Sequence, residues 1–203
     1  MKLQVARPKL RSVLLWTQRL LFACAAVLLG YCAFVLGDSW IFQRRARQAL
    51  DRQLSEAKSA ARPAVPAAFA PIGPDGLIGR IDIPRIGLSA VVFEGTGKVT
   101  LRRAVGHVTY TALPGQRGNV GLAGHRDSFF RPLRNIVLND IITLTTVHGE
   151  YRYRVAWTKI VSPYAVDVLD PSKTEILTLV TCYPFYFVGA APSRFIVRAE
   201  RIT

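Results

Sequence analysis

Cysteine is scarce in this sequence, which narrows the chemistry that the chain can carry. Its 203 residues include three cysteines, and Cys182 is the only one beyond residue 32. No Cys-x-x-Cys, His-x-x-x-His or paired-carboxylate motif occurs, so no metal site is predicted. A glycine-rich phosphate loop and a dinucleotide-binding fingerprint are also missing, and we expect no cofactor.

Acidic residues are also few. The chain has 13 of them against 27 lysines and arginines, which gives a net charge of +14. The positive charge is densest around a hydrophobic segment in the first third of the chain, whereas a nucleic-acid-binding protein carries it on a folded face with aromatic residues. This distribution favours a membrane surface over nucleic acid as the partner.

The hydrophobic segment is an uncharged run of eighteen residues, 20–37. If one aspartate near its end is tolerated, the run extends to residue 42, and about 20 apolar residues are enough to span a bilayer. Trp16 and Trp40 bracket it, and indole rings prefer the two membrane interfaces. The segment therefore reads as a membrane-spanning helix.

From this pattern we predict a basic cytoplasmic N-terminus over residues 1–19 and a transmembrane signal anchor over residues 20–42. The protein would then lie in the cell membrane as a single-pass protein, with its folded part outside the cytoplasm. A cleaved signal peptide is the alternative, with a weak cleavage site at residues 37–39. Its apolar core is typically only about 7–15 residues long, which favours the uncleaved anchor.

Residues 43–76 predict a connection between the anchor and the folded domain. The first twenty residues are mostly good helix formers with few large apolar groups, which predicts a solvated juxtamembrane helix or a disordered stalk. Four prolines between Pro63 and Pro74 then predict a stiff linker. We expect the folded domain to occupy residues 77–203.

The folded domain has the pattern of a mainly β protein. Seven or eight short runs of Ile, Val and Leu are separated by turn signals, which predicts an all-β barrel or sandwich with few helices. One run alternates cleanly, so that Tyr151, Tyr153, Val155 and Trp157 are predicted to share one face of a strand.

Three residues of this domain are placed where they could act together. Cys182 ends one predicted strand and Arg194 begins the next, so antiparallel pairing would make them face each other across a ten-residue loop. His125 directly follows another buried strand. An unpaired thiol in an exported domain is either reactive or bonded to another molecule. Each residue alone is most simply structural, but the set supplies a nucleophile, an acid and a positive group.

The other two histidines are weaker candidates for that acid. His148 lies in a predicted hairpin turn and is most simply a solvated loop residue. His107 precedes a short predicted strand and fits a structural role. We therefore assign chemistry to neither of them.

The sequences "TLVTCYPF", followed by Arg194, and "ALPGQRGNVGLAGHRD" resemble those of the sortases, membrane-anchored cysteine transpeptidases of bacterial cell surfaces. The resemblance covers residues 77–203, and the end of the chain is most similar to class D. It implies a closed eight-stranded sortase-like β-barrel with short helices, preceded by the transmembrane helix, and makes residues 77–203 the catalytic domain. By position, Cys182 is the nucleophile, His125 the general acid/base and Arg194 the oxyanion-stabilising residue, while Thr181 helps to bind the substrate.

The resemblance also implies a reaction. A Leu-Pro-x-Thr-Gly-like sorting signal of an exported protein is cleaved through a thioester, and the acyl group passes to an amine, such as a cell-wall precursor or a pilin lysine. Two alternatives stay open: a membrane-anchored cysteine endopeptidase that uses water as acceptor, and a non-catalytic β-barrel binding protein.

Overall fold

The computed structural model describes residues 8–59, 72–73, 75–187 and 189–202 and divides into two units, Met1–Ile41 and Phe42–Thr203. The strands are β1 (Leu77–Ile83), β2 (Leu88–Glu94), β3 (Val105–His107), β4 (Gly118–Ala123), β5 (Ile141–Thr146), β6 (Gly149–Val161), β7 (Glu175–Tyr183) and β8 (Ser193–Ile202). The α-helices are α1 (Pro8–Ser59) and α2 (Lys98–Arg103), and the short 3-10 helices are η1 (Pro84–Ile86), η2 (Arg131–Asn135) and η3 (Val166–Leu169).

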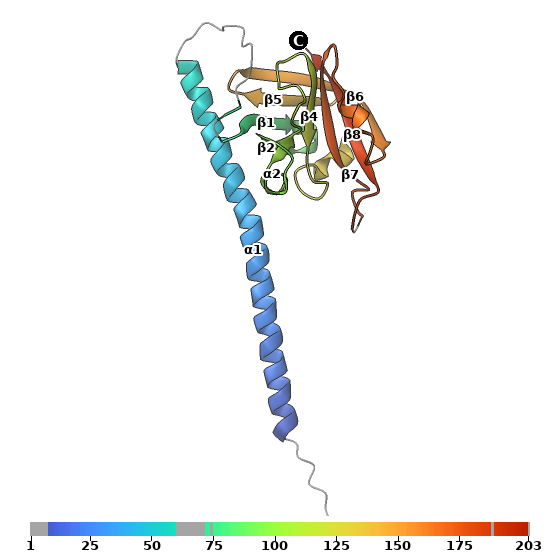
Figure 1. The fold of residues 1–203 in the computed structure, drawn as a ribbon. Helices are drawn as coiled ribbons and strands as arrows, with labels where there is room; N and C mark the ends of the chain where they lie inside the picture. Colours follow the sequence, from blue (N-terminus) through green and yellow to red (C-terminus); the bar gives the residue numbers. More distant parts are fainter. Residues whose placement is uncertain (1–7, 60–71, 74, 188, 203) are drawn as a thin grey trace, which may run out of the picture. The chain divides into compact units, whose positions relative to one another are not determined.

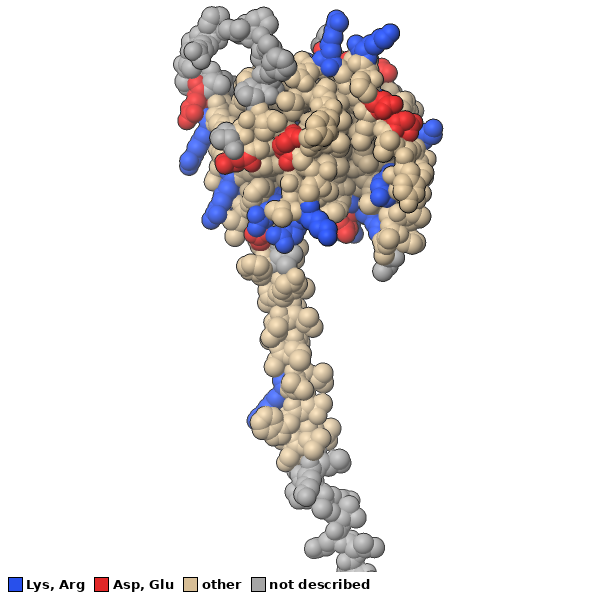
Figure 2. Space-filling view, in the orientation of Figure 1, with Lys and Arg blue, Asp and Glu red and all other residues tan. Residues whose placement is uncertain are grey.

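The first unit consists of the early part of helix α1. Within the described residues, α1 is the one helix that is long and apolar enough to cross a membrane, and the window concerned has none of its residues buried. Figure 2 shows this stretch as an almost uncharged length of helix. The helix is therefore a candidate membrane span, as the sequence predicts.

The eight described strands close into a barrel in the order β1-β2-β3-β4-β7-β8-β6-β5 (Figure 1). This confirms the predicted mainly β fold and decides between barrel and sandwich. Closure pairs the edges that an open sheet would expose. Most neighbours pair antiparallel, but β2 with β3 and β4 with β7 pair parallel.

The barrel interior holds the main hydrophobic core. Alternate residues of each strand point inward, and those of β4, β7 and β8 include Leu122, Leu179 and Val197, none of which is exposed to solvent. The residues between them therefore face the outside of the barrel, where the candidate site lies.

The last part of α1, which belongs to the second unit, is helical, as one of the two predicted alternatives has it, but one of its faces is buried and not solvated. Leu50 is 1% exposed, and Ala46 packs in a small apolar cluster with Val91 of β2. Gln43 accepts a hydrogen bond from the backbone N–H of Val91 and donates one to the carbonyl of Arg103. A small alanine allows the close approach, so few large apolar side chains are needed.

Strand β6 departs from the predicted alternation at a β-bulge. Tyr153 and Val155 are buried as expected, but the pairing with β8 shifts between Val155 and Trp157. An extra residue at a bulge reverses the faces beyond it. Trp157 is consequently 38% exposed and lies under the guanidinium of Arg198, at 5.1 Å from the ring centre.

An ion pair between the half-exposed Arg85 and the buried Asp140 fixes the end of the segment that follows β4. Arg85 of η1 donates to the carboxylate of Asp140, with 2.6 Å between Nη2 and Oδ2, and to the carbonyl of Asn135. The backbone N–H of Val137 donates to the same carboxylate. The Arg85 hydrogen bond is the main reason why the pKa of Asp140 lies below its ordinary value. Residues 125–140 are therefore anchored at their far end.

Candidate active site

Cys182 lies near the end of β7, on the outer face of the barrel. Leu177 and Leu179 point into the core, and strand alternation therefore turns Val180 and Cys182 outward. The thiol is free and its residue is only partly buried. These are the conditions under which a cysteine can meet a substrate.

The parallel pairing of β4 with β7 directs the segment that follows β4 towards Cys182. Their last strand pair is Ala123 with Val180. The pairing continues one step further, since the N–H of Gly124 donates to the carbonyl of Val180 at 3.2 Å. By the same register, we expect His125 to lie level with Cys182, although the two residues are 57 positions apart in the sequence.

The ring of His125 is presented from a fixed turn. The carbonyl of His125 accepts hydrogen bonds from the N–H groups of Ser128 and Phe130, at 3.4 and 3.1 Å. The histidine itself is exposed, while Phe130 is fully buried beneath the turn. A buried anchor thus fixes the backbone and leaves the imidazole open to solvent.

Arg194 is the direct partner of Cys182 in the antiparallel pairing of β7 with β8, as the loop length predicts. Directly opposed residues share one face of a sheet, with Cβ atoms about 5 Å apart. The Nη1 group of Arg194 donates to the carbonyls of Ala191 and Ser193, at 3.3 and 3.0 Å. The guanidinium is thereby tied to the loop that precedes β8.

Thr181 links the end of β7 to the end of β4 by a hydrogen bond. It is 2% exposed, and its Oγ1 donates to the carbonyl of Gly124 at 2.8 Å. This hydrogen bond joins Gly124, which precedes His125, to Thr181, which precedes Cys182. A substrate contact for Thr181 stays a prediction, whereas the hydrogen bond is present in the structure.

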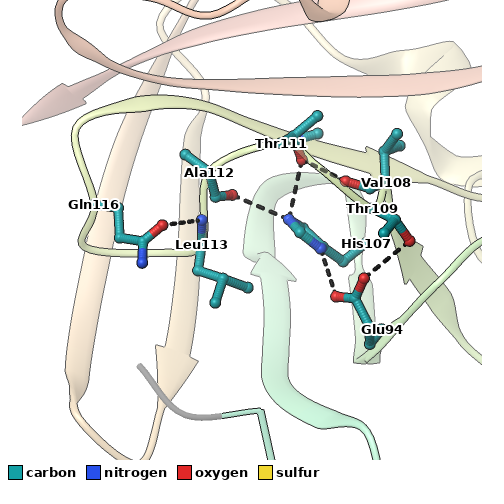
Figure 3. A network of polar contacts seen from close by, with 9 residues as sticks. Glu94, His107, Val108, Thr109, Thr111, Ala112, Leu113 and Gln116 are labelled. Atoms are coloured by element: carbon teal, nitrogen blue, oxygen red, sulfur yellow. Dashed lines mark hydrogen bonds and ion pairs between the residues drawn. The ribbon is translucent and has the colours of Figure 1, made fainter. Parts of the chain in front are cut away.

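His107 is a structural residue in the network shown in Figure 3. It is 2% exposed, and its Nδ1 lies 2.7 Å from the carboxylate of Glu94. Its Nε2 lies 3.0 Å from both the carbonyl of Ala112 and the hydroxyl of Thr111. Thr111 in turn accepts the N–H of Gly121 in β4. Both ring nitrogens are thus used: Nε2 holds the β3–β4 connection, and Nδ1 contacts the end of β2. His148, the third histidine, is exposed.

The η3 segment packs on the outer face of β4, a contact that the sequence did not predict. Asn119 of β4 donates to the carbonyls of Val168 and Asp170, both at 3.1 Å, and accepts the hydroxyl of Thr178 at 2.6 Å. Arg198 donates to the carbonyl of Val168 at 2.7 Å. Asn119 is 2% exposed, and its position on the outward face of a buried strand was the available signal.

The aromatic residues of the loop between β7 and β8 have two roles. Phe185 packs edge-on against Phe195 at 5.4 Å between ring centres and closes the end of the barrel core. Tyr186 and Phe187 are 77% and 43% exposed and line the surface. Among the described residues, no three His, Cys, Asp or Glu side chains gather as a metal site would require.

Comparison with known proteins decides the family. The model of the sortase domain matches residues 81–202, which is more than half of the chain. The chain belongs to the sortase family. Its barrel is that of the sortase domain, and the residues singled out above lie at the strand ends of that domain.

The similarity of this chain to known sortases is illustrated by two relatives in sequence and two solved structures. Sortase D of Bacillus subtilis is 36% identical over 126 residues, or 62% of this chain and 64% of that protein. Sortase A of Listeria monocytogenes is 33% identical over 53% of this chain and 50% of that protein. The matches thus span less than two thirds of either relative.

A Clostridium perfringens sortase D5 transpeptidase has the same fold, with a TM-score of 0.65 and 27% identity over 80% of this chain and 99% of that structure. Listeria monocytogenes sortase A gives a TM-score of 0.59 and 28% identity over 64% and 89%. The sortase domain is therefore similar to class D and class A members alike.

Proposed function

We propose that this sortase-family chain is a membrane-anchored cysteine transpeptidase. It would cleave a Leu-Pro-x-Thr-Gly-like sorting signal of exported proteins and transfer the new acyl group to an amine on the cell envelope. The observation that supports the proposal is the strand register: Cys182 pairs directly with Arg194, and the parallel ladder of β4 with β7 ends two residues before His125 and Cys182. Such a set supplies the nucleophile, proton donor and positive group of acyl transfer.

In the first half of the reaction, the thiolate of Cys182 attacks the threonine carbonyl of the signal. A C–S bond forms, and the oxygen of the tetrahedral intermediate takes the negative charge. Arg194 donates to that oxygen, since a guanidinium has five N–H donors and the carbonyls of Ala191 and Ser193 bind only Nη1. His125 protonates the leaving glycine amine as the C–N bond breaks, which leaves a thioester on Cys182.

In the second half, the acceptor amine attacks the thioester carbonyl. His125 now takes the proton from the attacking nitrogen, and the thiolate of Cys182 leaves as the new amide forms. Because the thioester conserves the energy of the broken amide, ligation needs no other energy source. The exposed position of His125 gives its ring access to both the leaving and the attacking amine.

Acceptor choice separates transpeptidase from endopeptidase. The full chain, held in lipid nanodiscs, is incubated with a panel of Leu-Pro-x-Thr-Gly-like peptides, with and without triglycine, and the products are read by mass spectrometry. We expect a product joined to triglycine. Cleavage that yields only the free carboxylate, at a rate that triglycine leaves unchanged, would favour the endopeptidase alternative.

Exchanging Arg194 for lysine should lower kcat/KM by about 10²-fold, because one ammonium cannot both keep the loop carbonyls and donate to the oxyanion. The measurement is steady-state cleavage of the best peptide of the panel. Arg152→Lys, an exposed exchange on β6, is the matched control and should retain the wild-type rate. An Arg194→Lys enzyme within threefold of wild type would remove Arg194 from the mechanism.

A further inference from the structure

Arg126, the residue after His125, reaches across to the loop that follows Cys182. Its Nη2 donates to the carbonyl of Phe187 at 2.7 Å and to the carbonyl of Gly189 at 3.0 Å. Its guanidinium carbon also lies 5.8 Å from the centre of the Phe187 ring. One side chain thus makes two hydrogen bonds and a ring contact with a single loop.

The same loop is held from its other end by Arg194. The loop comprises residues 184–192, described except for residue 188, and Arg194 binds the carbonyl of Ala191 within it. The three carbonyls of Phe187, Gly189 and Ala191 are therefore divided between two arginines. Any movement of the loop relative to Arg126 displaces the backbone to which Arg194 is tied.

The contacts of Arg126 lie beyond the end of the pairing between β4 and β7. The ladder between β4 and β7 stops at Ala123 and Val180, and the hydrogen bond of Thr181 is one residue further. His125 and Cys182 lie beyond both. Arg126 supplies a connection on the far side of this pair, so that the two segments are fastened before and after the reacting groups.

We propose that Arg126 is a positioning residue of the active site, which fixes the β7–β8 loop and through it the relative placement of His125, Cys182 and Arg194. The inference rests on the proposed function for its kinetic consequence, but the clamp itself is a physical property of the chain. A displacement of about 1 Å in reacting groups can cost 10²-fold in rate. Loss of the clamp should therefore lower kcat and leave KM nearly unchanged.

Two features separate this role from a contribution to stability. The Nη1 group of Arg126 is buried with no partner among the described residues, so a smaller side chain also removes an unsatisfied donor. Gly189 has φ +100°, a conformation that other residues rarely adopt, and a Cβ there would meet no atom within 4 Å. Gly189→Ala would thus strain the clamped loop while Arg126 stays in place.

Arg134 of η2 contacts the same loop and provides a matched control. Its guanidinium carbon lies 5.5 Å from the ring of Tyr186, which is 77% exposed. An exposed stack of this kind contributes little. Arg134→Gln therefore removes one charge and one loop contact, as Arg126→Gln does, but none of the hydrogen bonds to the loop carbonyls.

The test compares the wild-type full chain with Arg126→Gln, Gly189→Ala and Arg134→Gln, all in nanodiscs. Hydrogen exchange of peptides covering residues 184–192 is measured together with the melting temperature. We expect Arg126→Gln and Gly189→Ala to speed exchange of the loop about 10-fold, and Arg134→Gln to leave it within twofold of wild type. The melting temperature of Arg126→Gln should stay within about 3 °C of the wild-type value.

Kinetics with the best peptide of the panel complete the test. Arg126→Gln should lower kcat by about 10- to 100-fold with KM within threefold of wild type, and Arg126→Lys should fall between. Loop exchange equal to that of wild type in Arg126→Gln overturns the clamp. A lower melting temperature with unchanged kcat overturns the positioning role. If the wild type cleaves no peptide, the proposed function fails, while the exchange data still decide whether the clamp exists.

Discussion

Replacing Cys182 with alanine is expected to abolish cleavage and ligation, a loss of about 10⁴-fold or more in kcat/KM. The proposed reaction passes through a covalent thioester, and Cys182 is the only thiol of the barrel. The side chain is partly exposed on the outer face, so its loss leaves no cavity in the core. The free energy of unfolding should therefore change by no more than about 1 kcal/mol.

Intact-mass measurement makes this prediction direct. Wild-type protein incubated with a cleavable peptide should gain the mass of the acyl group, and Cys182→Ala should gain nothing. Cys24→Ala, an exchange in the exposed apolar part of α1, is the control and should form the adduct as wild type does. Turnover by Cys182→Ala at a rate near that of wild type would exclude a cysteine nucleophile. A wild-type thiol that no small alkylating reagent reaches would favour the non-catalytic barrel.

The sequence predicts the pairing of Cys182 with Arg194, because that pairing is determined by the pattern of a single hairpin. The apolar run of β7 and the length of the following loop predict that Cys182 and Arg194 meet across an antiparallel pair, and the strand pairing confirms it. Both residues belong to one hairpin, in which the loop joins neighbouring strands. Register in such a unit follows from the few residues that connect the strands.

Placement of His125 next to Cys182 could not be derived in the same way. It depends on the parallel pairing of β4 with β7, whose strands are separated by β5, β6 and the connections between them. The amphipathic pattern of each strand shows which face is buried and is silent about which strand lies beside it. Only the family resemblance supplied that neighbour.

Other features were missed because single residues override a regular pattern. The bulge at Val155 and Trp157 arises in pairing with β8, so the alternation of β6 alone does not contain it. Asn119 looked like an ordinary polar residue of a strand, but it binds two carbonyls of the η3 segment. The packing of Ala46 against Val91 depends on an apolar outer face of β2, which a helix sequence cannot reveal.

The two histidines near the strand ends provide the second large prediction. Exchanging His125 for alanine should lower kcat/KM by about 10³-fold, since the leaving amine then has no positioned proton donor. Its ring is exposed, so the free energy of unfolding should hardly change. The measurement is steady-state ligation of the best peptide to triglycine, together with denaturant unfolding.

His107→Ala is the matched exchange with the opposite expected outcome. Removing its ring leaves the partly buried carbonyl of Ala112 and the carboxylate of Glu94 without a partner on this side, which should lower the free energy of unfolding by about 2 kcal/mol. The fraction that stays folded should keep a kcat close to that of wild type, because the ring lies in the β3–β4 network. If His107→Ala lost activity while fully folded and His125→Ala kept it, the general acid would have to be reassigned. Burial is what makes the two expected outcomes differ: a ring whose two nitrogens are both engaged contributes to stability, whereas we expect the exposed ring of His125 to be free to move a proton.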